Sequence, residues 1–160
     1  MGSIPTIGSD ILDNKNMKSQ NSASQYDFFI SGKWRNKDKV LQLTKAIRDK
    51  GYSVYCFLES EHSIDRIAND PEEDMQNFEK LDWRNDSYVK KVFENDMEGQ
   101  RNSSTFVMLL PAGKSCHIEA GVAYGLGKKC ILIGVQKEAE SLYLIFDMVY
   151  LTEEEFLNTL

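Results

Sequence analysis

The sequence lacks any long apolar run. Its longest apolar stretches, residues 105–111 and 130–135, have the length of a buried strand and fall short of the roughly 20 residues that a membrane span needs. The N-terminus contains no apolar core of the kind that marks a signal peptide. We therefore expect no membrane association.

Cysteine is also scarce. Cys56, Cys116 and Cys130 are odd in number and form no CxxC pair, a pattern that argues against a disulfide framework and against a metal site. Free thiols suit a reducing compartment, so we expect a cytoplasmic protein without a bound metal.

Positive charge is in deficit. The chain has 19 basic and 25 acidic residues, a net charge of -6 and a pI near 5.0, so it has no basic footprint for nucleic acid. Its 160 residues are 41% hydrophobic, enough for one globular core. We expect a soluble protein with a small-molecule ligand and no nucleic-acid partner.

The chain divides into two parts. Residues 1–25 are rich in Ser, Asn and Gly and have no sustained apolar period, which predicts a disordered leader. Residues 26–160 form the predicted domain. The polar, acidic stretch 59–80 is expected to be a long excursion with about one helical turn.

Strand and helix patterns alternate along the domain. Apolar or β-branched runs predict strands at 26–30, 52–58, 105–110, 130–135 and 149–151. Helices are predicted at 37–50, at 81–98 with Gly99 as its end, within 111–128, within 137–146, and after Thr152, where Glu155 completes a capping box. This alternation predicts an α/β fold with a mostly parallel five-stranded sheet.

Ligands of such folds bind beyond the carboxyl ends of the strands. Three segments should meet there: 31–36, the residues from Glu59 onward, and 111–119. They carry chemically versatile side chains, namely Lys33, Trp34, Arg35, Lys114, Ser115, His117 and Glu119. We expect the functional site at this edge.

The segment 111–129 is the most informative. Gly113 suits a tight turn, and Gly121, Ala123 and Gly125 allow close approach to the sheet or to a partner helix. Glu119 is expected in the first helical turn, where the helix dipole favours an anion, the form that a carboxylate nucleophile must take.

Local alternatives to these roles remain. Glu119 could simply compensate the helix dipole, and Ser115 could be the N-cap. Gly113-Lys114-Ser115 matches only part of a P-loop, because Met108 stands where the first glycine is required.

The Glu-Ala-Gly-x-Ala-Tyr-Gly-x-Gly-Lys run that starts at Glu119 resembles the nucleophile motif of the nucleoside 2-deoxyribosyltransferase family. Residues 95–99 resemble the family's Asn-Asp-hydrophobic-x-Gly stretch, and residues 29–35 resemble its pocket loop. The resemblance spans about 26–134 and implies a flavodoxin-like three-layer sandwich.

The resemblance implies a retaining reaction at an N-glycosidic bond. Glu119 would attack C1′ and form a covalent glycosyl-enzyme, while Asp96 would engage the base. Gly32, Trp34, Arg35, Gly113, Lys114, Ser115 and His117 would bind the substrate. No cofactor is implied, and the protein would be a homo-oligomer whose subunits share sites.

The sequence also departs from the family. Gly113 stands where the transferases carry a second acidic residue, and Phe28 or Phe29 replaces a first-strand tyrosine. Cationic and polar neighbours could instead bind a phosphate, as in the related deoxynucleoside 5′-monophosphate N-glycosidases. A TIR-like NAD-cleaving domain, a TIR-type interaction domain and a non-catalytic nucleotide-binding module are the alternatives.

Overall fold

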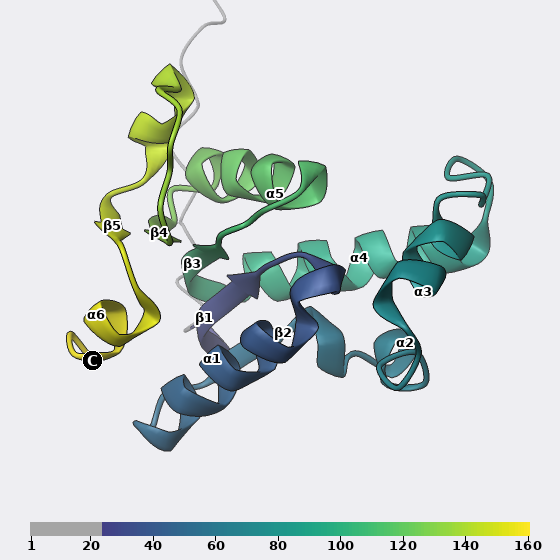
Figure 1. Ribbon diagram of the computed structural model, residues 1–160, viewed down its shortest axis with the longest axis horizontal. Coiled ribbons are helices and arrows are strands. Elements are labelled where there is room, and N and C mark those ends of the chain that lie inside the picture. The colour runs from purple at the N-terminus through teal and green to yellow at the C-terminus, as the bar shows by residue number, and fades with distance from the viewer. Residues whose placement is uncertain (1–23) are drawn as a thin grey trace, which may run out of the picture.

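The computed structural model describes residues 24–160. Its centre is a sheet of five parallel strands in the order β2-β1-β3-β4-β5 (Figure 1). The strands are β1 (Tyr26–Ser31), β2 (Val54–Cys56), β3 (Ser103–Leu109), β4 (Lys129–Ile133) and β5 (Met148–Tyr150). This is the strand order of flavodoxin-like folds, which confirms the predicted class. The predicted leader lies outside the described residues, apart from positions 24 and 25.

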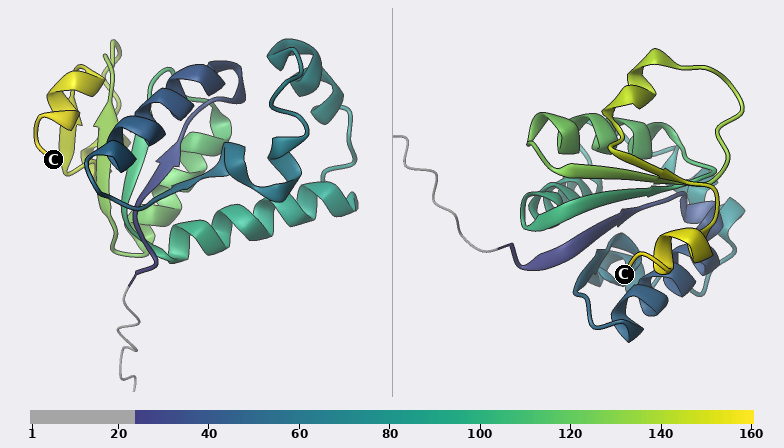
Figure 2. Two further views of the ribbon diagram at one scale, coloured as in Figure 1. Left: turned by 90° about the horizontal axis from the view of Figure 1, so that it is seen from below. Right: turned by 90° about the vertical axis from the view of Figure 1, so that its left-hand side faces the viewer.

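Helices cover both faces of the sheet (Figure 2). One face carries α1 (Lys37–Asp49) and α6 (Glu153–Leu157), and the other carries α4 (Ser87–Arg101) and α5 (Lys114–Gly125). Short 3-10 turns lie at η1 (Trp34–Asn36), η2 (Phe57–Glu59) and η3 (Ser141–Ile145). The sheet is therefore the middle of three layers.

The side chains of strand β3 explain why the sequences of the central strands are continuously apolar. Phe106 and Met108 belong to the core on the α5 side, whereas Val107 and Leu109 belong to the core on the α1 side. Because both faces of the sheet are covered, successive side chains are buried whichever way they point.

Capping signals placed two helix ends correctly. Thr152 accepts a hydrogen bond from the backbone N–H of Glu155 at 3.1 Å and begins α6. Gly51 follows α1 with a positive φ of 91°, the conformation expected of a C-terminal glycine. Gly99 does not end α4, however, because the helix continues to Arg101.

The stretch 59–80 is not a loop with one helical turn, and that prediction was wrong. It contains α2 (Glu61–Ile64) and α3 (Pro71–Phe78). Asp70 caps α3 by accepting from the N–H groups of Glu72 and Glu73, both at 3.0 Å, and Pro71 occupies the first helical position. The Asp-Pro pair was the available local signal.

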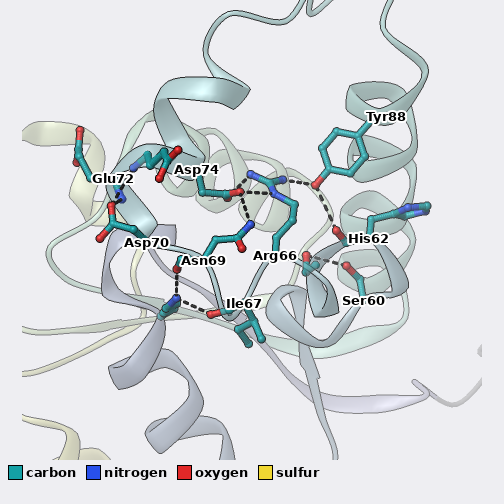
Figure 3. Close-up of polar contacts among 12 residues, drawn as sticks. Ser60, His62, Arg66, Ile67, Asn69, Asp70, Glu72, Asp74 and Tyr88 are labelled. Carbon is teal, nitrogen blue, oxygen red and sulfur yellow. Dashed lines mark hydrogen bonds and ion pairs between the residues drawn. The ribbon is translucent and has the colours of Figure 1, made fainter.

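A partly buried cation, the side chain of Arg66, holds this insert together (Figure 3). Arg66 pairs with Asp74 through two hydrogen bonds and also bonds to the Tyr88 hydroxyl. Its guanidinium lies over the rings of Trp34, Phe78 and Tyr88, 4.9, 5.5 and 5.2 Å from their centroids. The insert is thus packed against η1 and α4 by long-range contacts that its weak periodicity does not reveal.

Within residues 24–160, none of the helices has both the length and the apolar character needed to cross a bilayer.

Candidate active site at the carboxyl edge of the sheet

Glu119 and Ser31 meet at the carboxyl end of β1. Ser31 is the last residue of that strand and is buried, and its hydroxyl donates a hydrogen bond to Oε2 of Glu119 at 2.5 Å. The two residues are 88 positions apart in the chain. They come together because β1 and β3 are adjacent parallel strands and α5 follows β3. Glu119 therefore lies at the predicted edge.

The start of α5 differs from the sequence prediction. Its N-cap is Gly113 rather than Ser115, and none of the side chains that the structure describes caps the first turn. Gly113 has an extended backbone, with φ at -108° and ψ at -174°, so the turn does not require glycine. Because α5 begins at Lys114, Glu119 lies in the second turn, and the expectation of a dipole-stabilised anion was wrong.

Burial dominates the titration of Glu119. The pKa of its carboxyl is raised to about 8: desolvation raises it most, the Ser31 hydrogen bond lowers it, and the negative charge of Asp96 adds a smaller rise. Removal from water disfavours the charged form of a carboxyl group. At neutral pH the free protein holds Glu119 mostly protonated.

Asp96 lies on α4 and faces the same region. Burial raises the pKa of its carboxyl to about 6, partly offset by a hydrogen bond in which the Tyr55 hydroxyl donates to Oδ1 at 3.3 Å. Two carboxyl groups that influence each other and titrate at different pH values are typical of acid–base sites.

Besides Ser31, two further residues at this site were missed by the sequence analysis. Tyr55 comes from β2 and places a hydroxyl beside Asp96. Gln100 of α4 is 1% exposed, and its amide donates to the backbone carbonyl of Glu119 at 2.7 Å. This bond ties α4 to α5 and so fixes the two helices that carry the carboxyl groups. Neither residue belongs to a motif, and only the fold brings them here.

The loop after β1 contributes mainly packing. A Cβ atom on Gly32 would lie 2.5 Å from Cγ2 of Val40, so glycine is needed for α1 to approach. Trp34 is half-buried and packs on Phe57, with ring centroids 6.3 Å apart. Arg35 is paired with Glu72, its Nε 2.5 Å from Oε2. Roles for Gly32, Trp34 and Arg35 in substrate binding stay predictions.

The N-terminal turn of α5 carries the remaining predicted residues. Lys114 and Ser115 are exposed. His117 lies 2.6 Å, through Nδ1, from the Gly113 carbonyl, and its Nε2 lies 2.7 Å from the Tyr143 hydroxyl. A carbonyl can only accept, so Nδ1 carries a proton, and in the neutral ring Nε2 then accepts from Tyr143. His117 thus faces η3, and its role in binding stays a prediction.

Two surface cavities adjoin the strand ends, and neither is lined by Glu119 or Asp96. One of about 410 Å³ lies between Pro111, His117 and Tyr143. The other, of about 660 Å³, lies between α6 and the ends of β3 and β4. Among residues 24–160, no three His, Cys, Asp or Glu side chains are grouped so that they could hold a metal ion.

No protein-family model and no curated protein matches this sequence. Its structure is similar to that of a 2-deoxyribosyltransferase from Bacillus psychrosaccharolyticus, with a TM-score of 0.60 and 16% identity over 82% of this chain and 90% of that one. It is also similar to a CMP N-glycosidase from Clostridium botulinum, with a TM-score of 0.50 and 18% identity over 82% and 96%.

This chain has the fold of both enzymes. The structural likeness covers most of the chain of each of these two proteins, so the described domain is comparable to them in extent. At such low identity the likeness shows the fold alone, and the chemistry must be argued from the site.

Proposed function

We propose that this protein cleaves or transfers the N-glycosidic bond of a nucleoside or nucleotide through a covalent glycosyl-Glu119 intermediate. The observation that carries the proposal is that two buried carboxyl groups act on each other electrostatically, with Glu119 held by Ser31 and Asp96 held by Tyr55. The shared fold of a deoxyribosyltransferase and a CMP N-glycosidase supports it.

The reaction follows the logic of retaining glycosidases. A carboxylate oxygen of Glu119 attacks C1′, and the C1′–N bond breaks as Asp96 delivers a proton to the departing base. This leaves an acylal-type ester between the sugar and Glu119. Water or a second base then attacks C1′, loses a proton to Asp96, and releases Glu119 as a carboxylate.

The two carboxyl groups supply the required proton between them. With pKa values of about 6 for Asp96 and about 8 for Glu119, the pair holds one proton near pH 7. Coupled groups share such a proton, and the reactive form is the one in which it lies on Asp96 while Glu119 is ionised. A substrate that develops positive charge at the sugar favours that form, because it stabilises the adjacent anion.

A 5′-phosphate fits the start of α5. No side chain from residues 24–160 caps the first turn of this 12-residue helix, so within this part of the chain its backbone N–H groups are available to an anion. Lys114 and Ser115 are exposed beside it. These features favour a nucleoside monophosphate over a plain nucleoside, with Arg35 available only if its ion pair with Glu72 opens.

A second copy of this chain would complete the site. The outer side of α5 exposes Ile118 and Tyr124, and the C-cap residue Leu126 follows them; they are 68%, 59% and 47% accessible. Gly121 and Gly125 face the same open space, since a Cβ atom on either would meet nothing within 4 Å. An apolar surface next to the proposed nucleophile suits another subunit, which would also wall a pocket around Glu119.

The test is base release from a panel of deoxynucleosides, deoxynucleoside monophosphates and NAD, with and without an acceptor base. Wild type should release a free base, and the intact protein, quenched during turnover, should gain the mass of the sugar. Glu119→Gln should abolish both signals. Glu98→Gln, which neutralises an exposed carboxylate on α4, is the matched control and should retain activity.

Turnover that survives in E119Q would remove Glu119 from the mechanism. Absence of turnover for every compound would favour a binding module instead. The subunit arrangement is tested with Tyr124→Lys, whose molecular mass is measured by light scattering. If the arrangement is right, this variant dissociates into single chains and loses activity.

A further inference from the structure

The Tyr55 side chain is fixed on three sides. Its ring stacks on Phe29 with centroids 5.1 Å apart and planes 7° apart, and Tyr26 meets it edge-on at 5.6 Å. On the helix side it lies against Gly99, where an added Cβ atom would come within 2.5 Å of the ring. Such a ring has one orientation, so its hydroxyl has one position.

That hydroxyl is aimed at Asp96. It donates to Oδ1 at 3.3 Å, and within residues 24–160 it has no other hydrogen-bond partner. Asp96 in turn forms no salt bridge with any residue between 24 and 160. Among residues 24–160, Tyr55 from β2 hydrogen-bonds this carboxyl, and Glu119 from α5 interacts with it electrostatically. Tyr26 of β1 meets only the Tyr55 ring, and its own hydroxyl bonds to Gln25.

We infer that Tyr55 is the positioning residue for Asp96, holding Oδ1 so that Oδ2 alone is presented to the substrate base. This deepens the proposed function and rests on it. Gly99 contributes to this positioning, because any side chain at that position would displace the Tyr55 ring that carries the hydroxyl.

The consequence is stereochemical as well as electrostatic. A carboxylate whose Oδ1 already accepts a hydrogen bond takes up and delivers its proton at Oδ2. The hydrogen bond also stabilises the ionised form and lowers the pKa of the Asp96 carboxyl against the opposing effect of burial. Tyr55 thereby sets both the direction and the pH of proton transfer.

The variant that tests this is Tyr55→Phe, which keeps the stacked ring and removes only the hydroxyl. Tyr26→Phe is the matched control, because it removes a hydroxyl from the neighbouring ring that bonds to Gln25 and not to Asp96. The Asp96 carboxyl is followed by carbon NMR titration of the whole protein, with Asp96→Asn to assign its signal, and folding is checked by circular dichroism.

In Y55F the pKa of Asp96 should rise by about half a unit to one unit, as expected for the loss of one hydrogen bond to a carboxylate. The acid limb of the pH–rate profile should move up with it, and kcat should fall about tenfold with KM little changed. Y26F should leave all three quantities at their wild-type values.

If the pKa of Asp96 is the same in Y55F as in Y26F, the inference is overturned, whatever the thermal stability of the two variants. The titration needs no turnover, so its outcome is separate from that of the proposed function. If wild type cleaves no substrate, the proposed function fails, while the NMR comparison still decides whether Tyr55 controls Asp96.

Discussion

Ser31 Oγ donates to Oε2 of Glu119 across 2.5 Å and thereby joins the end of β1 to the second turn of α5. The bond orients one oxygen of the proposed nucleophile and leaves the other free. It also opposes the effect of burial, because a hydrogen bond to the ionised form lowers the pKa of the Glu119 carboxyl.

Removing this hydroxyl should therefore weaken catalysis and shift its pH dependence. In Ser31→Ala the pKa of Glu119 should rise by about one unit and kcat should fall about 10- to 100-fold, because the carboxyl loses both its orientation and its stabilised charge. Ser87→Ala, at an exposed serine of α4, serves as the control. A wild-type pH–rate profile in S31A would remove Ser31 from the site.

The wild-type enzyme should show a bell-shaped pH profile. Below about pH 6 both Asp96 and Glu119 are protonated and no nucleophile exists, whereas above about pH 8 both are ionised and no acid remains. Maximal kcat/KM is thus expected near pH 7. Measuring hydrolysis from pH 4 to 10 checks this, and activity that keeps rising above pH 9 would contradict the acid role of Asp96.

Two helical glycines should respond in opposite ways to the same substitution. Gly99→Ala forces the stacked Tyr55 ring to move, and such overpacking costs about 1–3 kcal/mol of unfolding free energy. Gly121→Ala meets open space and should be neutral or stabilising by up to about 1 kcal/mol. Urea unfolding of both variants at pH 7 measures the difference, and equal stabilities would refute the close contact at Gly99.

The insert should depend on the charge of Asp74. The Asp74 and Arg66 side chains are 9% and 20% exposed, and loss of one partner of such a pair costs about 2–4 kcal/mol. Asp74→Asn should therefore lower the unfolding free energy by that amount. Glu73→Gln, at an exposed neighbour, should change it by less than about 0.5 kcal/mol.

The same pair gives the insert a pH dependence. Burial raises the pKa of Asp74, but the hydrogen bonds and charge of Arg66 outweigh it, so the net pKa lies below the usual value of 3.8. A lowered folded-state pKa contributes stability above the unfolded pKa, and that stability is lost as pH falls through the folded value. Hydrogen exchange of residues 61–78 should increase below about pH 4 in wild type, and D74N should lack this dependence.

The sequence by itself determined the α/β class, the five parallel strands and the helix that carries Glu119. Local patterns suffice for these features, because burial on both faces makes a strand such as β3 continuously apolar and because a residue such as Thr152 signals a helix start within one turn. The position of Glu119 at the carboxyl edge also follows, since α5 directly succeeds β3.

Only the tertiary structure decided the chemical state of the site. The helix-dipole argument predicted an anionic Glu119, whereas packing between α4, α5 and β1 raises its pKa through desolvation. Tyr55 and Ser31 reach their carboxyl partners from positions 41 and 88 residues away in the chain. Burial and long-range hydrogen bonds depend on which elements pack together, and no local spacing in the sequence encodes that information.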